Sequence, residues 1–158
     1  MPKKYLNKIL NAPVYDVAIE SPLDTAPSLS QRLGNRVLIK REDLQPVFSF
    51  KLRGAYNKLI NLPESARNKG VIAASAGNHA QGVALAAARI KVPATIVMPQ
   101  TTPDIKVSAV RKWGAKVILH GDDFAAAYAC AMDIIGKQGL TLIHPLSLIH
   151  ISEPTRPY

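Results

Sequence analysis

Lys51 has the residue type and the neighbours for covalent chemistry. It follows two phenylalanines, Phe48 and Phe50, and opens a run to Leu62 in which apolar residues recur at helical spacing. The amine of a lysine at the start of a helix can bond to an aldehyde as a Schiff base. Most lysines, however, are solvated surface groups. Lys51 taken alone therefore leaves both interpretations open.

A second candidate segment, SAGNHAQG, occupies residues 75–82. It follows a strand pattern and opens a helical pattern, and the start of a helix offers unpaired N–H groups to an anion. Gly77 would let the backbone approach a ligand, and Gly82 would let the helix pack closely. The alternative is an ordinary helix start capped by Ser75 or Asn78. Neither a G-x-G-x-x-G motif nor a P-loop is present.

Both segments belong to a chain that alternates short strands with helices. Strand patterns fall at residues 71–74, 94–98, 116–119 and 141–143, and helical patterns fall at 78–90, 103–113 and 122–137. Thr102, Pro103 and Asp122 are placed to begin two of the helices, and Gly114 and Gly139 are placed to end two. The alternation predicts an α/β fold with a doubly wound parallel sheet and helices on both faces.

The residues before Lys51 give weaker patterns. They predict a helix over 5–12, a strand over 14–18, a turn at 21–23, a helical turn over 29–33 closed by Gly34, and a strand over 37–40. The mixed charges at residues 40–43 are typical of a solvated loop.

The composition argues against a nucleic-acid partner. Of the 158 residues, 47% are apolar and 20% are charged, which is ordinary for a globular domain. A net charge of +9 could favour an anionic partner, but the basic residues are spread along the chain and aromatic residues are few. Stacking platforms for bases are therefore not expected.

The single cysteine, Cys130, excludes an internal disulfide and suits a reducing compartment. It lies in an alanine-rich helical pattern, where we expect a core hydrophobe and not a nucleophile. No apolar run is long enough to cross a bilayer, and the N-terminal residues lack a signal region. These features predict a cytoplasmic protein with no membrane partner, and they predict no metal site.

Two segments carry a family resemblance. Residues 40–55, KREDLQPVFSFKLRGA, resemble the cofactor-lysine motif of the biosynthetic threonine dehydratases, and residues 75–82 resemble the substrate and cofactor loop of that family. The resemblance runs from about Leu6 to Pro145, and Ser21 stands where the family usually has threonine. It implies the fold-type II (tryptophan synthase β-like) fold, with pyridoxal 5′-phosphate as cofactor.

The resemblance implies a role for each residue of the two motifs. Lys51 would carry the cofactor on its amine and later move the α-proton of the substrate, and Phe50 would pack near the cofactor ring. Asn78 would hydrogen-bond the 3-hydroxyl oxygen of that ring. The substrate carboxylate would be bound by the backbone of Ser75, Ala76, Gly77, Asn78 and His79. Lys51 and this loop should then converge on one cleft at the carboxyl ends of the strands.

The implied reaction converts L-threonine to 2-oxobutanoate and ammonia, which is the first step of isoleucine biosynthesis. Serine/threonine dehydratases and serine racemases share the fold and the lysine, so L-serine is an alternative substrate. The non-enzymatic alternative is a basic binding module, which would lack the yellow colour of a lysine-bound pyridoxal cofactor. The resemblance also implies that the full-length protein is a homo-oligomer.

The sequence divides into three predicted parts. Residues 1–45 are expected to belong to a large catalytic domain, residues 46–145 to form the small cofactor domain, and residues 146–158 to be a non-native tail. The tail resembles the in-frame translation of a sequencing-library adapter. We therefore expect an incomplete fragment, inactive alone, that lacks the phosphate cradle, the group facing the pyridine nitrogen and the regulatory domain of the family.

Overall fold

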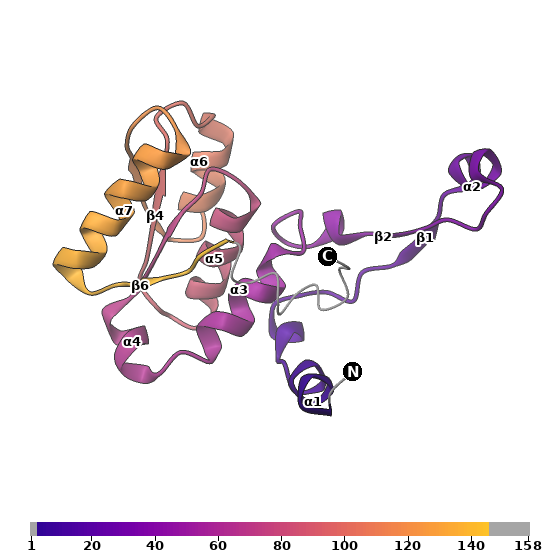
Figure 1. The fold of residues 1–158 in the computed structure, drawn as a ribbon, viewed down its shortest axis with the longest axis horizontal. Helices are drawn as coiled ribbons and strands as arrows, with labels where there is room; N and C mark the ends of the chain where they lie inside the picture. The colour runs from indigo at the N-terminus through magenta and orange to yellow at the C-terminus, as the bar shows by residue number, and fades with distance from the viewer. Residues whose placement is uncertain (1–2, 146–158) are drawn as a thin grey trace.

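A four-stranded parallel sheet forms the centre of the computed structural model, which describes residues 3–145. The strands are β3 (Val71–Ala74), β4 (Ala94–Met98), β5 (Lys116–Leu119) and β6 (Thr141–Leu142), and their order is β5-β4-β3-β6 (Figure 1). Val71 lies opposite both Ala94 and Thr141, and Thr95 lies opposite Lys116. The four predicted strands and their parallel arrangement are confirmed. The predicted tail, residues 146–158, lies outside the described residues.

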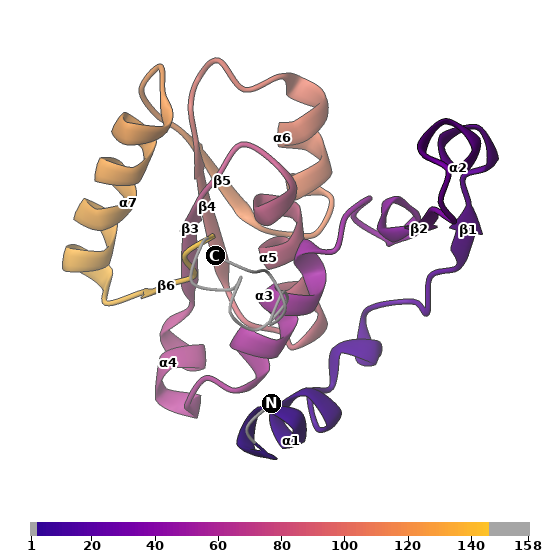
Figure 2. The ribbon, with the colours of Figure 1, turned by 45° about the vertical axis from the view of Figure 1, so that its right-hand side comes forward.

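Helices cover both faces of the sheet, as the sequence predicted. The helices α5 (Asn78–Arg89) and α6 (Asp104–Arg111) pack on one face, and α7 (Phe124–Gln138) packs on the other (Figure 2). The chain advances from β3 to β5 through α5 and α6, and then returns past β3 to β6 through α7. Crossovers of one hand place helices on opposite faces when the direction of strand progression reverses. The sheet is therefore doubly wound.

The central strand β3 is buried on both faces. Val71 and Ala73 join the core formed with α3, α5 and α6, whereas Ile72 and Ala74 join the core beneath α7. This alternation follows from the two-residue period of a strand. A parallel strand covered by helices on both sides needs apolar residues at every position, and the sequence VIAA supplies them.

The helix α3 (Lys51–Ile60) packs against α5 at a glycine. A Cβ atom on Gly82 would lie 3.0 Å from the carbonyl carbon of Lys51 and 3.1 Å from the amide nitrogen of Leu52. Backbone atoms of a helix cannot move aside as a flexible side chain can, so a larger residue would push the two helices apart. Because residue 82 is glycine, the first turn of α3 lies directly against the second turn of α5.

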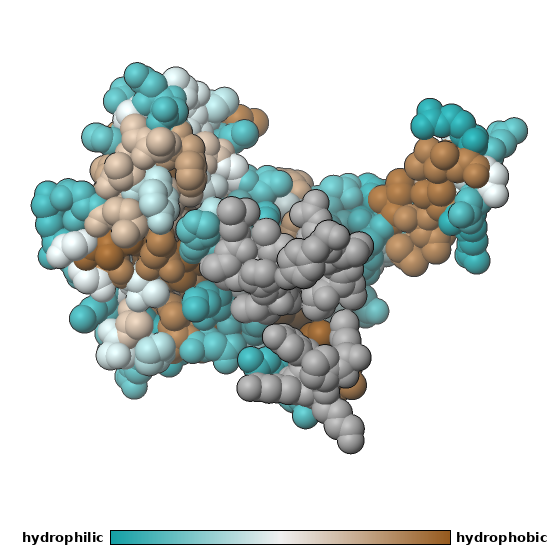
Figure 3. Space-filling view, in the orientation of Figure 1, coloured by the Kyte–Doolittle hydropathy of each residue, from teal (hydrophilic) through white to brown (hydrophobic). Residues whose placement is uncertain are grey.

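The residues before α3 form an arm that extends away from the sheet (Figure 1). Its elements are α1 (Lys3–Leu10), the 3-10 helix η1 (Val14–Asp16), β1 (Leu23–Thr25), α2 (Pro27–Leu33), β2 (Leu38–Lys40) and the 3-10 helix η2 (Glu42–Leu44). β1 and β2 pair antiparallel, with Leu23 opposite Lys40, and α2 lies at the tip between them. Exposed apolar side chains gather on this part of the arm (Figure 3), namely Leu23, Leu33, Leu38 and Ile39.

The predicted strand over residues 14–18 is wrong, because these residues form a helical turn. The N–H of Ala18 donates to the carbonyl oxygen of Val14 at 2.9 Å. Val14, Val17 and Ala18 have the spacing i, i+3, i+4, which fits a helical turn as well as a strand when the segment is so short. The hydroxyl of Tyr56 donates to Asp16 at 2.8 Å and so ties this turn to α3.

Several predicted boundaries shift by one or two residues. The cap of α7 is Asp123, which accepts from the N–H of Ala126 at 2.8 Å, and not the predicted Asp122. Pro103 precedes the first residue of α6, and Gly114 lies beyond the end of that helix. Gly139 ends α7 as predicted, with φ 65 in the left-handed region.

Three further differences concern short elements. Leu23, predicted to lie in a turn, begins β1, and α4 (Glu64–Lys69) was not predicted. The helix α3 ends at Ile60, because Leu62 precedes a proline and residues in that position disfavour helical backbone angles.

The contact at Gly82 predicts a difference between two helical glycines. Gly82→Ala should lower the free energy of unfolding by about 1–3 kcal/mol, because the added methyl group would overlap backbone atoms of α3. Gly136→Ala in α7 is the matched control, since a Cβ there would meet no atom within 4 Å. It should raise the stability by about 0.5–1 kcal/mol, the helix preference of alanine over glycine. Urea denaturation of both variants measures this, and equal effects would contradict the proposed packing.

Candidate functional site

Lys51 is the first residue of α3, and its side chain is half-buried beside Phe50. The Nζ atom lies 5.0 Å from the centroid of the Phe50 ring, a distance at which an aromatic face attracts an ammonium group. Phe48, three positions before Lys51, has φ 55 and is 75% exposed. A bulky residue with left-handed backbone angles is strained, and strain of this kind is concentrated at ligand sites.

The loop after β3 leaves the carboxyl edge of the sheet and leads into α5. The N–H of Ser75 donates to the carbonyl oxygen of Val97 at 3.0 Å, and the hydroxyl of Ser75 accepts from the N–H of Gly77 at 3.3 Å. Gly77 occupies the cap position of α5 and makes no capping bond through a side chain. The alternative of an ordinary helix start capped by Ser75 or Asn78 is therefore wrong.

The surroundings of this loop are open. A Cβ atom on Gly77 would meet no atom within 4 Å. The side chain of Asn78 is exposed and makes no hydrogen bond to any other residue between 3 and 145. The first N–H groups of α5 have no partner within the helix, because hydrogen bonding in an α-helix begins one turn later. The loop thus has open space at Gly77 and an exposed, unpartnered amide at Asn78.

The structure places the start of α3 against α5, although Ala74 at the end of β3 lies 23 positions after Lys51 in the sequence. The backbone of Lys51 lies against Gly82, one turn from the start of α5. The charge of Lys51 also contributes to a lowered pKa of His79 in the first turn of α5. Both helices therefore begin in the same region. The prediction that Lys51 and the loop line one cleft stays a prediction.

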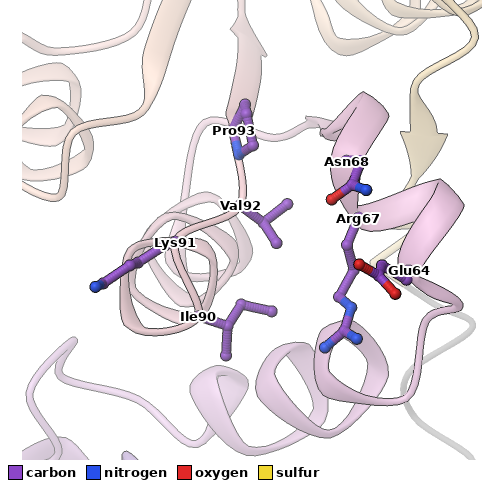
Figure 4. Close-up of a pocket in the computed structure, with 7 residues that line it drawn as sticks. All are labelled: Glu64, Arg67, Asn68, Ile90, Lys91, Val92 and Pro93. Atoms are coloured by element: carbon purple, nitrogen blue, oxygen red, sulfur yellow. The ribbon is translucent and has the colours of Figure 1, made fainter.

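A hollow at the opposite edge of the sheet does not involve these residues. It has a volume of about 490 Å³ and is lined by Glu64, Arg67, Asn68, Ile90, Lys91, Val92 and Pro93 (Figure 4). Pro93 directly precedes β4, so the hollow lies at the amino ends of the strands. Ligands of open α/β sheets bind at the carboxyl ends. In Figure 4, Lys91 points away from the other lining residues, so the basic groups do not converge.

Glu42 is the centre of a charged network that the sequence did not predict. Its carboxylate lies 2.8 Å from Nε of Arg53, accepts from the hydroxyl of Ser21 at 2.6 Å and accepts from the amide of Gln45 at 3.2 Å. The mixed charges at residues 40–43 predicted a solvated loop, which is wrong for Glu42, whereas Lys40 and Asp43 are exposed. No local pattern could have found this network, because the partners of Glu42 lie up to 21 residues away.

The network fixes the arm to the helix that carries Lys51. Arg53 belongs to the first turn of α3, and Gln45 is buried with 1% exposure. The side-chain amide of Gln45 accepts from the N–H of Ile19 and donates to its carbonyl oxygen, both at 2.9 Å. This pair of bonds imitates a rung of a β-sheet and satisfies a backbone segment outside any strand.

The electrostatics of Glu42 follow from its partners. Partial burial opposes the charge and raises the pKa, but the hydrogen bonds from Arg53 and Ser21 outweigh it and lower the pKa of Glu42 to about 2. The second ion pair of the arm, between Arg41 and Asp24 at 2.7 Å, is more exposed. Exposed pairs contribute less to stability than shielded ones.

The fold is that of a class of cofactor-dependent enzymes. The chain belongs to the family of pyridoxal-phosphate dependent enzymes, whose family model matches residues 14–154.

Among individual proteins, the chain is similar to biosynthetic threonine dehydratases. The chain is 58% identical over 144 residues to the biosynthetic L-threonine dehydratase of Burkholderia multivorans, covering 89% of the chain and 28% of that relative. It is 58% identical over 142 residues to the chloroplastic biosynthetic threonine dehydratase of Arabidopsis thaliana, covering 90% of the chain and 24% of that relative. The chain thus spans about a quarter of the length of these curated relatives.

Solved structures agree in fold. The processed form of threonine deaminase isoform 2 from Solanum lycopersicum superimposes with a TM-score of 0.86 at 58% identity, covering 90% of this chain and 39% of that one. Serine racemase from Dictyostelium discoideum superimposes with a TM-score of 0.82 at 30% identity, covering 91% and 48%. The fold-type II class implied by the motifs is therefore confirmed.

The residues around Lys51 fit the cofactor of this family. A half-buried amine suits an aldehyde, and the aromatic ring of Phe50 lies beside that amine. The unpartnered amide of Asn78 suits a phenolic oxygen, and the open space at Gly77 leaves room for a planar ring. Nothing in the donor set is acidic, so an anionic cofactor meets no repulsion from these residues.

The charged network predicts a pH-dependent loss of stability. Glu42→Gln should lower the free energy of unfolding at pH 7 by about 1–3 kcal/mol, because it replaces charge-assisted bonds to Arg53. The pKa of Glu42 is lower in the folded state, so its contribution is complete above the ordinary value of 4.5 and is lost as the pH falls through about 2. The difference between wild type and variant should shrink over that range.

A control for this experiment lies on the surface of α7. Asp133→Asn removes an exposed ion pair with Lys137 and should change the stability by less than about 0.5 kcal/mol. Urea denaturation between pH 7 and pH 2 measures both variants. A Glu42→Gln effect no larger than that of Asp133→Asn would show that the network does not stabilise the fold.

Proposed function

We propose that this chain is the lysine-bearing part of a threonine dehydratase, which converts L-threonine to 2-oxobutanoate and ammonia with pyridoxal 5′-phosphate. The observation that supports the proposal is the packing of the Lys51 backbone against Gly82, one turn from the start of α5. Relatives named threonine dehydratase are 58% identical to this chain, which supports threonine as the substrate. The activity is proposed for the whole protein, because this chain covers only about a quarter of the length of these relatives.

Lys51 would bind the cofactor and move the proton, and Asn78 would orient the cofactor. When bound, the cofactor supplies an electron sink that makes loss of the α-proton feasible. The amine of Lys51 would bond to the cofactor aldehyde and, once released by the substrate amine, take the proton from the α-carbon. Asn78 would fix the plane of the ring by donating to its 3-hydroxyl oxygen, and Phe50 would pack beside the ring.

The loop of residues 75–79 would bind the substrate carboxylate. Backbone N–H groups at the start of α5 are unpaired within the helix, and the positive end of the helix dipole lies there. An anion held at this point leaves the α-carbon of the amino acid close to the start of α3. Departure of the β-hydroxyl as water and hydrolysis of the resulting enamine would then give the oxo acid and ammonia.

The division into domains belongs to the same proposal. Residues 1–45 would form part of a large domain, since the apolar side chains at the tip of the arm are exposed, and residues 46–145 would form the small cofactor domain. We propose that the full-length enzyme is a homo-oligomer. A cytoplasmic location is proposed from the single cysteine, although some relatives are named chloroplastic. No helix among residues 3–145 is long and apolar enough to cross a membrane.

Serine is the second candidate substrate. The similarity to a serine racemase at 30% identity, with a TM-score of 0.82, supports a related enzyme that acts on L-serine. An assay of the full-length protein that carries this chain separates the two, since threonine turnover gives 2-oxobutanoate whereas racemisation gives D-serine. A kcat/KM for serine above that for threonine would reverse the assignment.

The proposed covalent bond is tested on the chain itself. After incubation with pyridoxal 5′-phosphate and reduction with borohydride, peptide mapping should show more label on Lys51 than on exposed lysines such as Lys112 and Lys116. Lys51→Ala should abolish the preferred label, and Lys58→Ala, which alters the same helix, should retain it. Equal labelling of all lysines would show that Lys51 has no special affinity for the cofactor.

Turnover should separate the roles of Lys51 and Asn78 in the full-length protein. Lys51→Ala should lower kcat by about a thousandfold or more, because it removes both the covalent anchor and the proton-transfer group. Asn78→Ala should lower kcat by about 10- to 100-fold, because it loosens the orientation of the cofactor without breaking the covalent bond. A larger loss for Asn78→Ala than for Lys51→Ala would contradict these assignments.

A further inference from the structure

The side chain of His79 is buried, with one ring nitrogen bonded and the other unpartnered. It is 4% exposed, and its Nε2 atom lies 2.8 Å from the carbonyl oxygen of Ile143. Its Nδ1 atom has no hydrogen-bond partner among residues 3–145. Neither the sequence motif nor the proposed reaction gives this side chain a role, and a buried polar group needs a physical reason.

The bond to Ile143 determines which nitrogen carries the hydrogen. A backbone carbonyl oxygen accepts and cannot donate, so Nε2 of His79 must be the donor. In the neutral ring the other nitrogen then has no hydrogen and can only accept. The structure thus specifies one tautomer of His79.

The surroundings of the ring keep it neutral. Burial lowers the pKa of His79, and the bond to Ile143 partly opposes this shift. The ammonium group of Lys51 on α3 and the imidazole of His144 after β6 lower the pKa further. A charged ring here would repel the amine of Lys51, so neutrality is also favourable for the site.

The same bond joins two parts of the sheet that the chain does not connect directly. His79 belongs to the first turn of α5, which follows β3, whereas Ile143 directly follows β6. Ile143 is itself held by its N–H, which donates to the carbonyl oxygen of Ile72 at 2.8 Å. The start of the 75–79 loop is held by the bond between Ser75 and Val97. His79 holds its end.

We propose that His79 is a positioning residue, whose neutral ring donates from Nε2 to Ile143 and thereby fixes the loop that presents Asn78 and the backbone N–H groups beside Lys51. It takes no part in proton transfer. The consequence for catalysis rests on the proposed function, whereas the tautomer and the anchoring of the loop do not.

The tautomer is measured on the wild-type 158-residue chain. Two-bond 15N–1H correlation spectra of the histidine rings should show hydrogen on Nε2 of His79 and a pKa of the ring below its ordinary value. The His79→Gln spectrum assigns the signal, because it removes one of four histidines. A ring with hydrogen on Nδ1, or one that titrates with an ordinary pKa near 6.5, would overturn the proposal.

The anchoring role is tested by a matched pair of variants. In His79→Gln the side-chain nitrogen lies about as far along the side chain as Nε2 and can still donate to Ile143. In His79→Asn the nitrogen stands at the position of Nδ1 and cannot reach. Borohydride labelling of Lys51 should stay within about twofold of wild type for glutamine and fall roughly tenfold for asparagine, the effect of one lost buried hydrogen bond.

The outcomes separate this inference from the proposed function. If wild type labels Lys51 preferentially and both variants match it, the anchoring role is wrong. If His79→Asn and His79→Gln reduce the labelling of Lys51 equally, loss of the bond to Ile143 is not the cause of the reduction. If wild type shows no preference for Lys51, the proposed function fails, while the spectra still decide the tautomer of His79.

Discussion

The contact between Gly82 and the backbone of Lys51 is the constraint on which the arrangement of the site depends. With no Cβ at residue 82, the start of α3 approaches α5 at a distance that no other residue would permit. That approach places the backbone of the first residue of α3 one turn from the start of α5. The alanine side chains of α5 are also small, and they let this helix lie close to the central strand β3.

A second constraint on α3 comes from the arm. The pair between Glu42 and Arg53, together with Gln45 and its two bonds to Ile19, joins the arm to the first turn of the helix. A half-buried carboxylate is unfavourable unless it is fully hydrogen-bonded, and here donors from three residues satisfy it. The arm is thus held at its base by polar bonds, while its tip exposes leucine and isoleucine side chains. The helix that begins with Lys51 is therefore held both by its packing against α5 and by the ion pair between Arg53 and Glu42.

The two edges of the parallel sheet have different chemical properties. At the amino ends, the side chain of Lys91 points away from the other residues that line the hollow near Pro93. At the carboxyl ends, strands lead into helix starts, whose first N–H groups have no backbone partner within the helix. The buried ring of His79 links two of these strand ends and is held neutral by its surroundings. Family membership, fold and local chemistry therefore point to the same edge.

The sequence alone determined the four strands of the sheet and the helices between them, and it indicated the residues proposed for the chemistry. These features depend on periodicity over 4 to 15 residues and on two motifs, Lys51 with its neighbours and the segment 75–82, which are local in the chain. Only the tertiary structure decided the rest. The steric role of Gly82, the bonds of Glu42 and the partner of His79 all join residues that are distant in the sequence, and no local pattern encodes such a pairing. The turn at 14–18 shows the same limit. Its five residues fit the period of a helix and that of a strand equally well, and the contact that holds the turn, from Tyr56 to Asp16, joins residues distant in the sequence.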